Sequence, residues 1–238
     1  MNSSFELFES SLLLRDLRHR PSPQSSQALA EAARSYGPYH DTDWVIGIED
    51  ALTRRSRPSE GDSPYLRDLA ELILKAVVES SDPARRPYPA AGAIYTAQMY
   101  FVVRRVPDLP SGTYFFRAAD VALERIGSSE EAEEFLVDGL YQDRQENIPA
   151  LVLLLSDITL AKQKYHDLAI RFALLEAGAV LQNCYLAAER LGLAVCALGA
   201  ISDRRALDVC HRIGNDDVFF AGALSIAARH APARPPTS

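Results

Sequence analysis

Apolar positions along the chain follow helical spacing in some segments and strand spacing in others, and the two kinds of segment are interleaved. Helical spacing predicts helices over residues 4–18, 26–35, 66–80, 130–141, about 165–191 and 202–213. Strand spacing and continuous apolar runs predict strands over residues 98–105, 113–117, 121–126, 149–156, 193–200 and 217–229. Because several strands follow one another through short turns, the pattern indicates an α+β fold with a largely antiparallel central sheet.

Two segments are apolar throughout and therefore predict the centre of the molecule. Residues 149–156, "PALVLLLS", fit a strand that is covered on both faces. Residues 172–191 are apolar or small at almost every position, which is typical of a helix buried in a core or at a dimer interface. Its polar exceptions, Glu176, Gln182 and Asn183, need partners if they are buried, and structural hydrogen bonds are the favoured interpretation.

Composition narrows the class of protein. The chain has 238 residues, of which 47% are hydrophobic and 24% charged, as in soluble globular proteins. The net charge of -7 argues against a nucleic-acid partner. No apolar run approaches the length of a membrane span, and the N-terminus lacks the features of a signal peptide, so we expect a cytoplasmic protein with no membrane contact. One domain is expected over residues 47–230, with an N-terminal helical extension, 1–46, and a Pro-rich tail, 231–238.

The cysteine pattern gives no sign of a metal site. The chain has three cysteines, Cys184, Cys196 and Cys210, whose spacing matches no set of metal ligands. They lie in or beside apolar segments. We therefore expect buried free thiols in a reducing compartment, and no bound metal.

Two short segments have the chemistry of a ligand site, although each also has an ordinary structural explanation. "ALTRRSRPSEGD" contains Arg54, Arg55 and Ser56, and guanidinium groups match phosphate geometry; a solvated face is the alternative. "RRPYPAAGAIY" contains Pro89, Ala90, Ala91, Gly92 and Ala93. Such small residues let a flat ligand approach the backbone closely, but the segment lacks the Lys–Ser/Thr element of a phosphate-binding P-loop.

A lysine and a tyrosine, Lys164 and Tyr165, stand side by side at the polar entry of the long apolar helix. One interpretation is that they are the solvated end of a core helix. The other is that they face a closed site and move protons there. Free lysine and tyrosine side chains titrate near pH 10, so a base of this kind would need burial and a charged neighbour to act at neutral pH.

Together, three ordered segments resemble the nitroreductase-like flavoproteins, and within them the SagB-type dehydrogenases, which oxidise azolines to azoles. The segments are "RRS", "RPYPAAGAIYTAQMYFVVRRV" and "KYHDLAIRFALLEAGAVLQNCYLAAERLGLAVCALGA". The resemblance covers roughly residues 50–228. It implies an FMN-binding α+β fold and a homodimer with flavin sites between the subunits. It also implies that the substrate is a peptide or small-molecule azoline and that a carrier or cyclodehydratase is an associated protein.

The resemblance also implies roles for individual residues. Arg54, Arg55 and Ser56 would hold the phosphate and ribityl chain, and Arg229 would close on the phosphate. Residues Pro89, Ala90, Ala91, Gly92 and Ala93 would contact the isoalloxazine ring, with Leu198, Gly199 and Ala200 on its other side. Lys164 and Tyr165 match the pair that marks the azoline-oxidising subgroup, in which hydride passes to flavin N5 and the proton to the pair.

Some positions depart from the family pattern. Serine is usual where this chain has Ala90, proline where it has Thr96, and a Pro-Ile-Gly-Gly-like run where it has "ALGA" at 197–200. "PSEGD" after Arg57 lacks the usual basic or aromatic continuation. Two alternatives therefore stay open: an NAD(P)H-dependent nitro- or quinone reductase, and a flavin-free partner subunit on the same fold.

Overall fold

The computed structural model describes residues 62–78, 85–118, 121–141 and 148–229. The helices predicted over 4–18 and 26–35, the cluster at Arg54–Ser56 and the predicted domain boundaries lie outside these ranges.

The centre of the protein is a six-stranded sheet in which every neighbouring pair is antiparallel, in the order β3-β2-β1-β4-β6-β5. The strands are β1 (Ala97–Val103), β2 (Gly112–Arg117), β3 (Ala122–Gly127), β4 (Ala150–Asp157), β5 (Leu193–Leu198) and β6 (Val218–Ala228). All six strands predicted from the sequence are present, and the antiparallel α+β prediction is confirmed.

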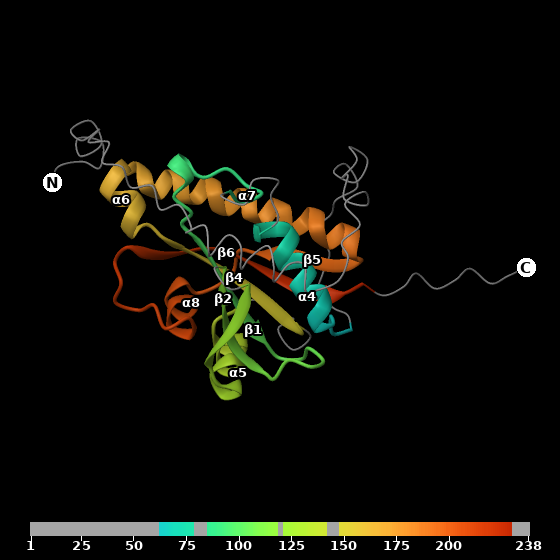
Figure 1. Ribbon diagram of the computed structural model, residues 1–238. Helices are drawn as coiled ribbons and strands as arrows, with labels where there is room; N and C mark the ends of the chain where they lie inside the picture. The colour runs from blue at the N-terminus through green and yellow to red at the C-terminus, as the bar shows by residue number, and fades with distance from the viewer. Residues whose placement is uncertain (1–61, 79–84, 119–120, 142–147, 230–238) are drawn as a thin grey trace, which may run out of the picture.

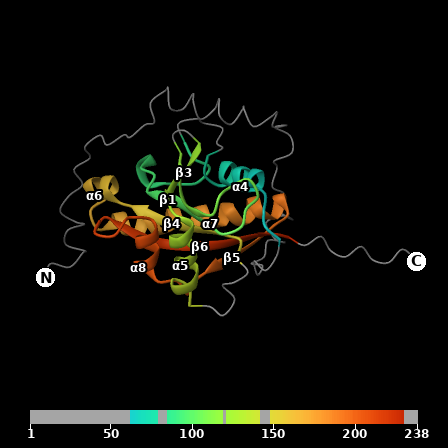
Figure 2. The same cartoon turned by 90° about the horizontal axis from the view of Figure 1, so that it is seen from below.

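Helices cover both faces of this sheet, so that the protein has three layers (Figures 1 and 2). On one face lie α7 (Leu168–Leu191) and α4 (Leu66–Ile73), which continues as a π-helical turn, Leu74–Val78. The opposite face is covered by α5 (Ser129–Asp138) and α8 (Asp203–Val209). Among the described residues, no helix is long and apolar enough to cross a membrane.

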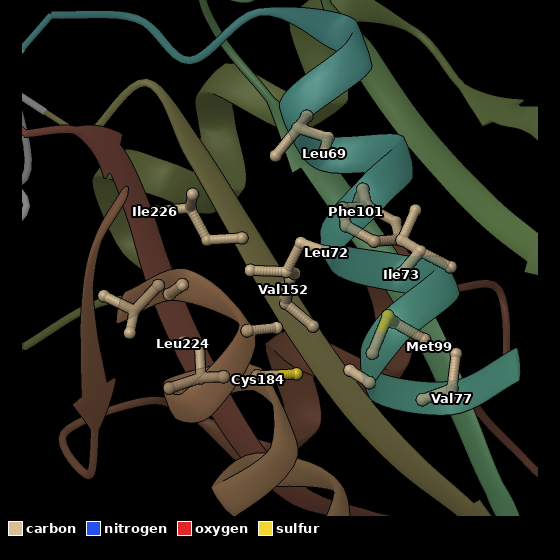
Figure 3. Close-up of a cluster of buried hydrophobic side chains, with 14 of the residues drawn as sticks. Leu69, Leu72, Ile73, Val77, Met99, Phe101, Val152, Cys184, Leu224 and Ile226 are labelled. Atoms are coloured by element: carbon tan, nitrogen blue, oxygen red, sulfur yellow. The ribbon is translucent and has the colours of Figure 1, made fainter. Parts of the chain in front are cut away.

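Strand β4 explains why the sheet needs cover on both sides. Its side chains alternate between the two faces, and seven of its eight residues are buried. Val152 and Leu154 pack with α4 and α7, whereas Leu151 and Leu153 pack with α5 and α8. Figure 3 shows the first of these cores, where side chains of α4, β1, β4, β6 and α7 meet.

The prediction of one helix starting near residue 165 was wrong at its beginning. Lys164 and Tyr165 end a separate short helix, α6 (Thr159–Tyr165), and α7 begins only at Leu168. The break falls at His166, whose φ of 49° and ψ of -130° lie outside the helical region. The pair therefore stands at a corner between two helices and is not the first turn of the long one.

All three cysteines are free thiols, as predicted, but their burial differs. Cys184 and Cys210 are buried, and burial raises the pKa of the Cys184 thiol to about 12. Cys196 lies on the edge strand β5 and is only half-buried, so the prediction of full burial was wrong at this position. An edge strand has a neighbour on one side only, which leaves room for solvent.

Candidate active site at the Gly92 loop

The predicted small-residue loop, residues 89–93, precedes β1, and all of its residues are exposed or half-buried. It ends in a single 3-10 turn, Ala91–Ala93, in which the N–H of Ala93 donates to the carbonyl of Ala90 at 3.2 Å. Gly92 and Ala93 both have left-handed backbones, with φ of 60° and 56°. For alanine this conformation costs about 1–2 kcal/mol. Strain of this kind is concentrated at functional sites, so it marks the loop as a candidate.

Lys164 and Tyr165 are half-buried at the corner between α6 and α7. The ammonium nitrogen of Lys164 lies 5.2 Å from the centroid of the Tyr165 ring, a cation–π arrangement. The tyrosine ring also meets the ring of Phe172 edge to face, with centroids 5.1 Å apart. These contacts restrict how far the tyrosine ring can move.

The structure brings this pair directly against the loop, a contact that the sequence did not predict. A Cβ atom built on Gly92 would overlap the hydroxyl oxygen Oη of Tyr165 and would lie 2.9 Å from Nζ of Lys164. Both polar groups therefore point at the same spot on the loop backbone, and only glycine leaves room for them there. In both cartoon views the turn that contains Gly92 lies beside α6 (Figures 1 and 2).

An apolar cluster packs beside this contact. It consists of buried Ile94, Ile158, Ala161, Ala169 and Ala173, with Tyr165 and Phe219 packed against it. Ile94 belongs to the end of the loop, while the alanines belong to α6 and α7. The cluster therefore joins the loop to the corner that carries Lys164 and Tyr165.

Two of the polar exceptions in α7 hold the ends of the loop segment. The buried carboxylate of Glu176 accepts hydrogen bonds from Thr96 and Ala97, and the side-chain amide of Asn183 donates to the carbonyls of Ala76 and Pro87. The expectation of structural hydrogen bonds is thus confirmed for both residues. Sequence reasoning did not find that both bond the segment around the loop, because helical spacing alone does not say what a face contacts.

The second predicted flavin-contacting segment, residues 198–200, begins level with the middle of β6 and lies three strands away from β1. Leu198 ends β5 opposite Ala223 of β6, and β4 and β6 separate it from the start of β1. The carbonyl of Ala200 accepts the N–H of Tyr141, which holds the segment beside the end of α5. Gly199 is exposed.

Arg229 lies at the opposite end of the sheet from Tyr165. It follows the last residue of β6, whereas Phe219, near the first, packs against the Tyr165 cluster. Phe219 and Arg229 are ten residues apart in the chain, and at about 3.3 Å per strand residue this is a distance of about 30 Å. The Arg229 guanidinium makes a two-bond pair with Glu189, at 3.2 and 2.7 Å, and its Nε is buried without a hydrogen-bond partner.

The pair is not among the residues that line two hollows in the described part of the chain. One, of about 160 Å³, lies between Tyr88, Tyr95 and Gln98 beside the loop. The other, of about 940 Å³, lies between α4 and the β2–β3 hairpin. We place the candidate site at Gly92, because an ammonium and a hydroxyl converge there on an exposed backbone.

Comparison with known proteins identifies the family. The Nitroreductase family profile matches residues 54–226. The protein named "Putative nitroreductase MJ1384" of Methanocaldococcus jannaschii is 28% identical over 166 residues, which are 69% of this chain and 84% of that protein.

Solved structures share the fold at low identity. A crystal structure of a putative nitroreductase from Anabaena variabilis matches 76% of this chain, with a TM-score of 0.63 and 21% identity. This chain spans only 38% of that longer chain. A chain of the Escherichia coli microcin synthetase McbBCD complex, with truncated pro-MccB17 bound, has a TM-score of 0.64 and 17% identity, and the match covers 94% of this chain and all of that one. With its profile match over most of the chain and its six-stranded antiparallel sheet, the protein belongs to the Nitroreductase family.

Proposed function

We propose that this protein is an FMN-dependent dehydrogenase that oxidises an azoline ring to the corresponding azole. The observation that carries the proposal is the convergence of Lys164 and Tyr165 on the backbone of Gly92. Oxidising an azoline removes a proton from one ring carbon and a hydride from its neighbour. The site must therefore offer a proton acceptor beside a hydride acceptor, and the pair provides the first.

The residues of the loop fit a flavin. Gly92 and Ala93 are exposed, carry little or no side chain and present their backbone at the surface, as a flat ring requires. When bound, FMN would supply the hydride acceptor, at its N5 atom. Arg54, Arg55, Ser56 and Arg229 remain the proposed phosphate and ribityl ligands, and Leu198, Gly199 and Ala200 the proposed second contact with the ring.

The proton step falls to the side chains at the corner. Tyr165 offers an oxygen and Lys164 a nitrogen at the same point of the loop. One of them takes the proton from the ring carbon, while the other stabilises and orients it. The contact of Tyr165 with Phe172 holds the ring in place, so the acceptor does not have to be ordered during the reaction.

A homodimer follows from the position of the proposed ligands. Within one chain, Arg229 follows the last residue of β6, whereas Tyr165 lies near the first residues of that strand. The two residues are therefore too far apart for a single FMN to contact both. Two chains that meet across α7 can bring Arg229 of one protomer to the loop of its partner. The exposed side of α7 is suited to this contact, because Ile170, Leu174 and Leu175 are 48%, 50% and 66% exposed.

The dimer has a direct test. Leu175→Glu is expected to convert the dimer to a monomer, because a charge would be buried at the centre of the apolar contact. Light scattering during size-exclusion chromatography gives the mass, and flavin absorbance gives the FMN content, which should fall with it. Val137→Glu is the matched control, since Val137 is 55% exposed on α5, on the other face of the sheet. A Leu175→Glu dimer that keeps its FMN would contradict this interface.

Two comparisons bear on the substrate. The Escherichia coli neighbour is part of a synthetase complex with a bound precursor, which supports a precursor substrate and associated proteins for this chain. The other two relatives are named putative nitroreductases, which favours the alternative of a reductase.

One experiment separates the candidate functions. The purified protein should carry about one FMN per chain, and with oxygen or another acceptor it should remove two hydrogen atoms from a thiazoline or oxazoline, as followed by mass spectrometry. Rapid oxidation of NAD(P)H with no change in azolines would identify the reductase. A colourless protein that takes up no added FMN would point to a flavin-free partner subunit.

A further inference from the structure

We propose that Glu176 is a positioning residue for the site: its buried carboxylate holds the start of β1 on α7, and so keeps the Gly92 loop against Lys164 and Tyr165. This inference deepens the proposed function and rests on it for the link to FMN. Its hydrogen bonds go to Thr96 and Ala97, which are not among the proposed flavin-binding residues.

Three hydrogen bonds converge on the carboxylate. Its Oε1 accepts the backbone N–H groups of Thr96 and Ala97, both at 2.9 Å, and its Oε2 accepts the hydroxyl of Thr96 at 3.0 Å. Glu176 is 2% exposed, so water cannot replace a lost bond cheaply. A buried carboxylate with three donors is a strong attachment point for the chain that leaves the loop.

The same helix holds the other end of the loop segment. Asn183 donates to the carbonyl of Pro87 at 3.0 Å. Glu176 and Asn183 are seven residues apart, which is about two helical turns or 10.5 Å along α7. The segment from Pro87 to Thr96 is therefore attached at two points to one rigid element, and Gly92 lies between them.

Between these two attachments, the loop also packs against α7 near the corner that carries Lys164 and Tyr165. Ile94 packs against Ala169 and Ala173, one to two turns before Glu176 on the same helix. Moving the start of β1 away from Glu176 would pull Ile94 out of this contact. The displacement would then reach Gly92 and change its close approach to the Tyr165 hydroxyl and the Lys164 ammonium.

Thr96 gives this chain two hydrogen bonds that a proline at the same position could not make. Proline, the usual residue at this position in the related flavoproteins, has no N–H and no hydroxyl. Thr96 supplies two of the three donors to Glu176. The departure at Thr96 is thus matched by a buried acceptor on α7, and the two residues form one unit.

Burial and hydrogen bonding have opposite effects on the pKa of this carboxyl group. Burial raises the pKa of Glu176, and the bonds from Ala97 and Thr96 act against that rise. Among the described groups packed nearby is Tyr88, whose pKa is raised by burial and further by the Glu176 charge. The three donors all suit the ionised form, which accepts without donating.

The test compares two substitutions at this position. Glu176→Gln keeps an oxygen for the two N–H groups, and its amide can donate to the Thr96 hydroxyl, so the attachment survives. Glu176→Leu keeps the volume and removes every acceptor. Hydrogen exchange of the FMN-free protein, measured on peptides that cover residues 89–101, reports the attachment directly. Titration with FMN then reports whether the site depends on it.

We expect Glu176→Leu to speed exchange at Thr96 and Ala97 and to weaken FMN binding, each by about tenfold or more, the loss of one to two charged hydrogen bonds. Glu176→Gln should stay within about threefold of the wild type in both measurements. Thr96→Val removes only the hydroxyl donor and should give a smaller loss in the same direction, which keeps the test usable if Glu176→Leu does not fold.

Cys184→Ala is the control for a purely structural effect. Cys184 is fully buried in α7, one residue from Asn183, and the substitution should lower the melting temperature without changing loop exchange or FMN affinity. The proposal is overturned if Glu176→Leu leaves both readouts unchanged, if Glu176→Gln is as damaging as Glu176→Leu, or if Cys184→Ala reproduces the effect. A wild-type protein that binds no FMN would refute the proposed function, while hydrogen exchange would still decide whether Glu176 holds the loop.

Discussion

Tyr165→Phe is expected to lower turnover of an azoline substrate by about 10²–10⁴-fold, the usual contribution of a general base. The substitution removes one hydroxyl and keeps the ring, so the contact with Phe172 and the surrounding apolar cluster should persist. FMN content and melting temperature should therefore remain close to those of the wild type. The measurement is the steady-state rate of azole formation by mass spectrometry at saturating substrate.

Lys164→Ala should cause a loss of the same order, and the double variant should lose little more than either single variant. Groups that act as one unit cannot be lost twice, so the effects are non-additive. Tyr114→Phe is the matched control, because its hydroxyl donates to the carbonyl of Pro110 at 2.6 Å, away from the Gly92 loop. Wild-type turnover in both Tyr165→Phe and Lys164→Ala would show that the pair is only a solvated corner. Loss of FMN in these variants would place the pair in the binding site and the base elsewhere.

Gly92→Ala is expected to lower turnover by about 100-fold, the cost of a displacement of about 1 Å at a reacting centre. The new Cβ would overlap the Tyr165 hydroxyl and press on the Lys164 ammonium, so one of the two must leave its place. The left-handed backbone at this position adds about 1 kcal/mol of destabilisation for any residue other than glycine. Rates and melting temperatures measured together separate the two effects.

Gly192→Ala provides the comparison that isolates backbone strain. Gly192 has a similar φ of 67°, and a Cβ there would meet nothing within 4 Å. It should lose stability like Gly92→Ala but keep its activity. Combining Gly92→Ala with Tyr165→Phe should also restore part of the lost stability, because the overlapping hydroxyl is gone. Equal activity in the two alanine variants would mean that the contact at Gly92 has no role in the reaction.

Most of the fold could be predicted because local patterns and burial agree. The run at 149–156 is apolar on both sides of the strand, and β4 is indeed covered by helices on both faces. The start of α5 was predicted to within one residue, where Ser128 caps the helix and Glu131 returns the bond, but its end was predicted three residues too late, at 141 rather than at Asp138. The break at His166 could not be predicted. No glycine or proline marks it, and the conformation is imposed by packing around it.

The residues of the candidate site could be singled out from the sequence, but their arrangement in space could not be predicted from it. The small-residue loop and the Lys–Tyr pair could each be found from their composition, and the order of the segments indicated a flavoprotein. The cluster at Arg54–Ser56 lies outside the described residues and remains a prediction. Arg229 was singled out for a phosphate, and in the structure it pairs with Glu189, a contact between residues 40 positions apart that no local pattern indicates.

By itself, the sequence determined the six strands, the helices α4, α5, α7 and α8, the antiparallel α+β class and the chemical types available to a site, because these depend on short-range periodicity and residue chemistry. The short helix α6 was not predicted. Only the tertiary structure decided that Gly92 meets Lys164 and Tyr165, and that Glu176 and Asn183 hold the two ends of the loop between them. The physical reason is that these contacts join segments far apart along the chain. Their geometry is set by how α6, α7 and β1 pack together, and the spacing of residues within any one segment does not specify that packing.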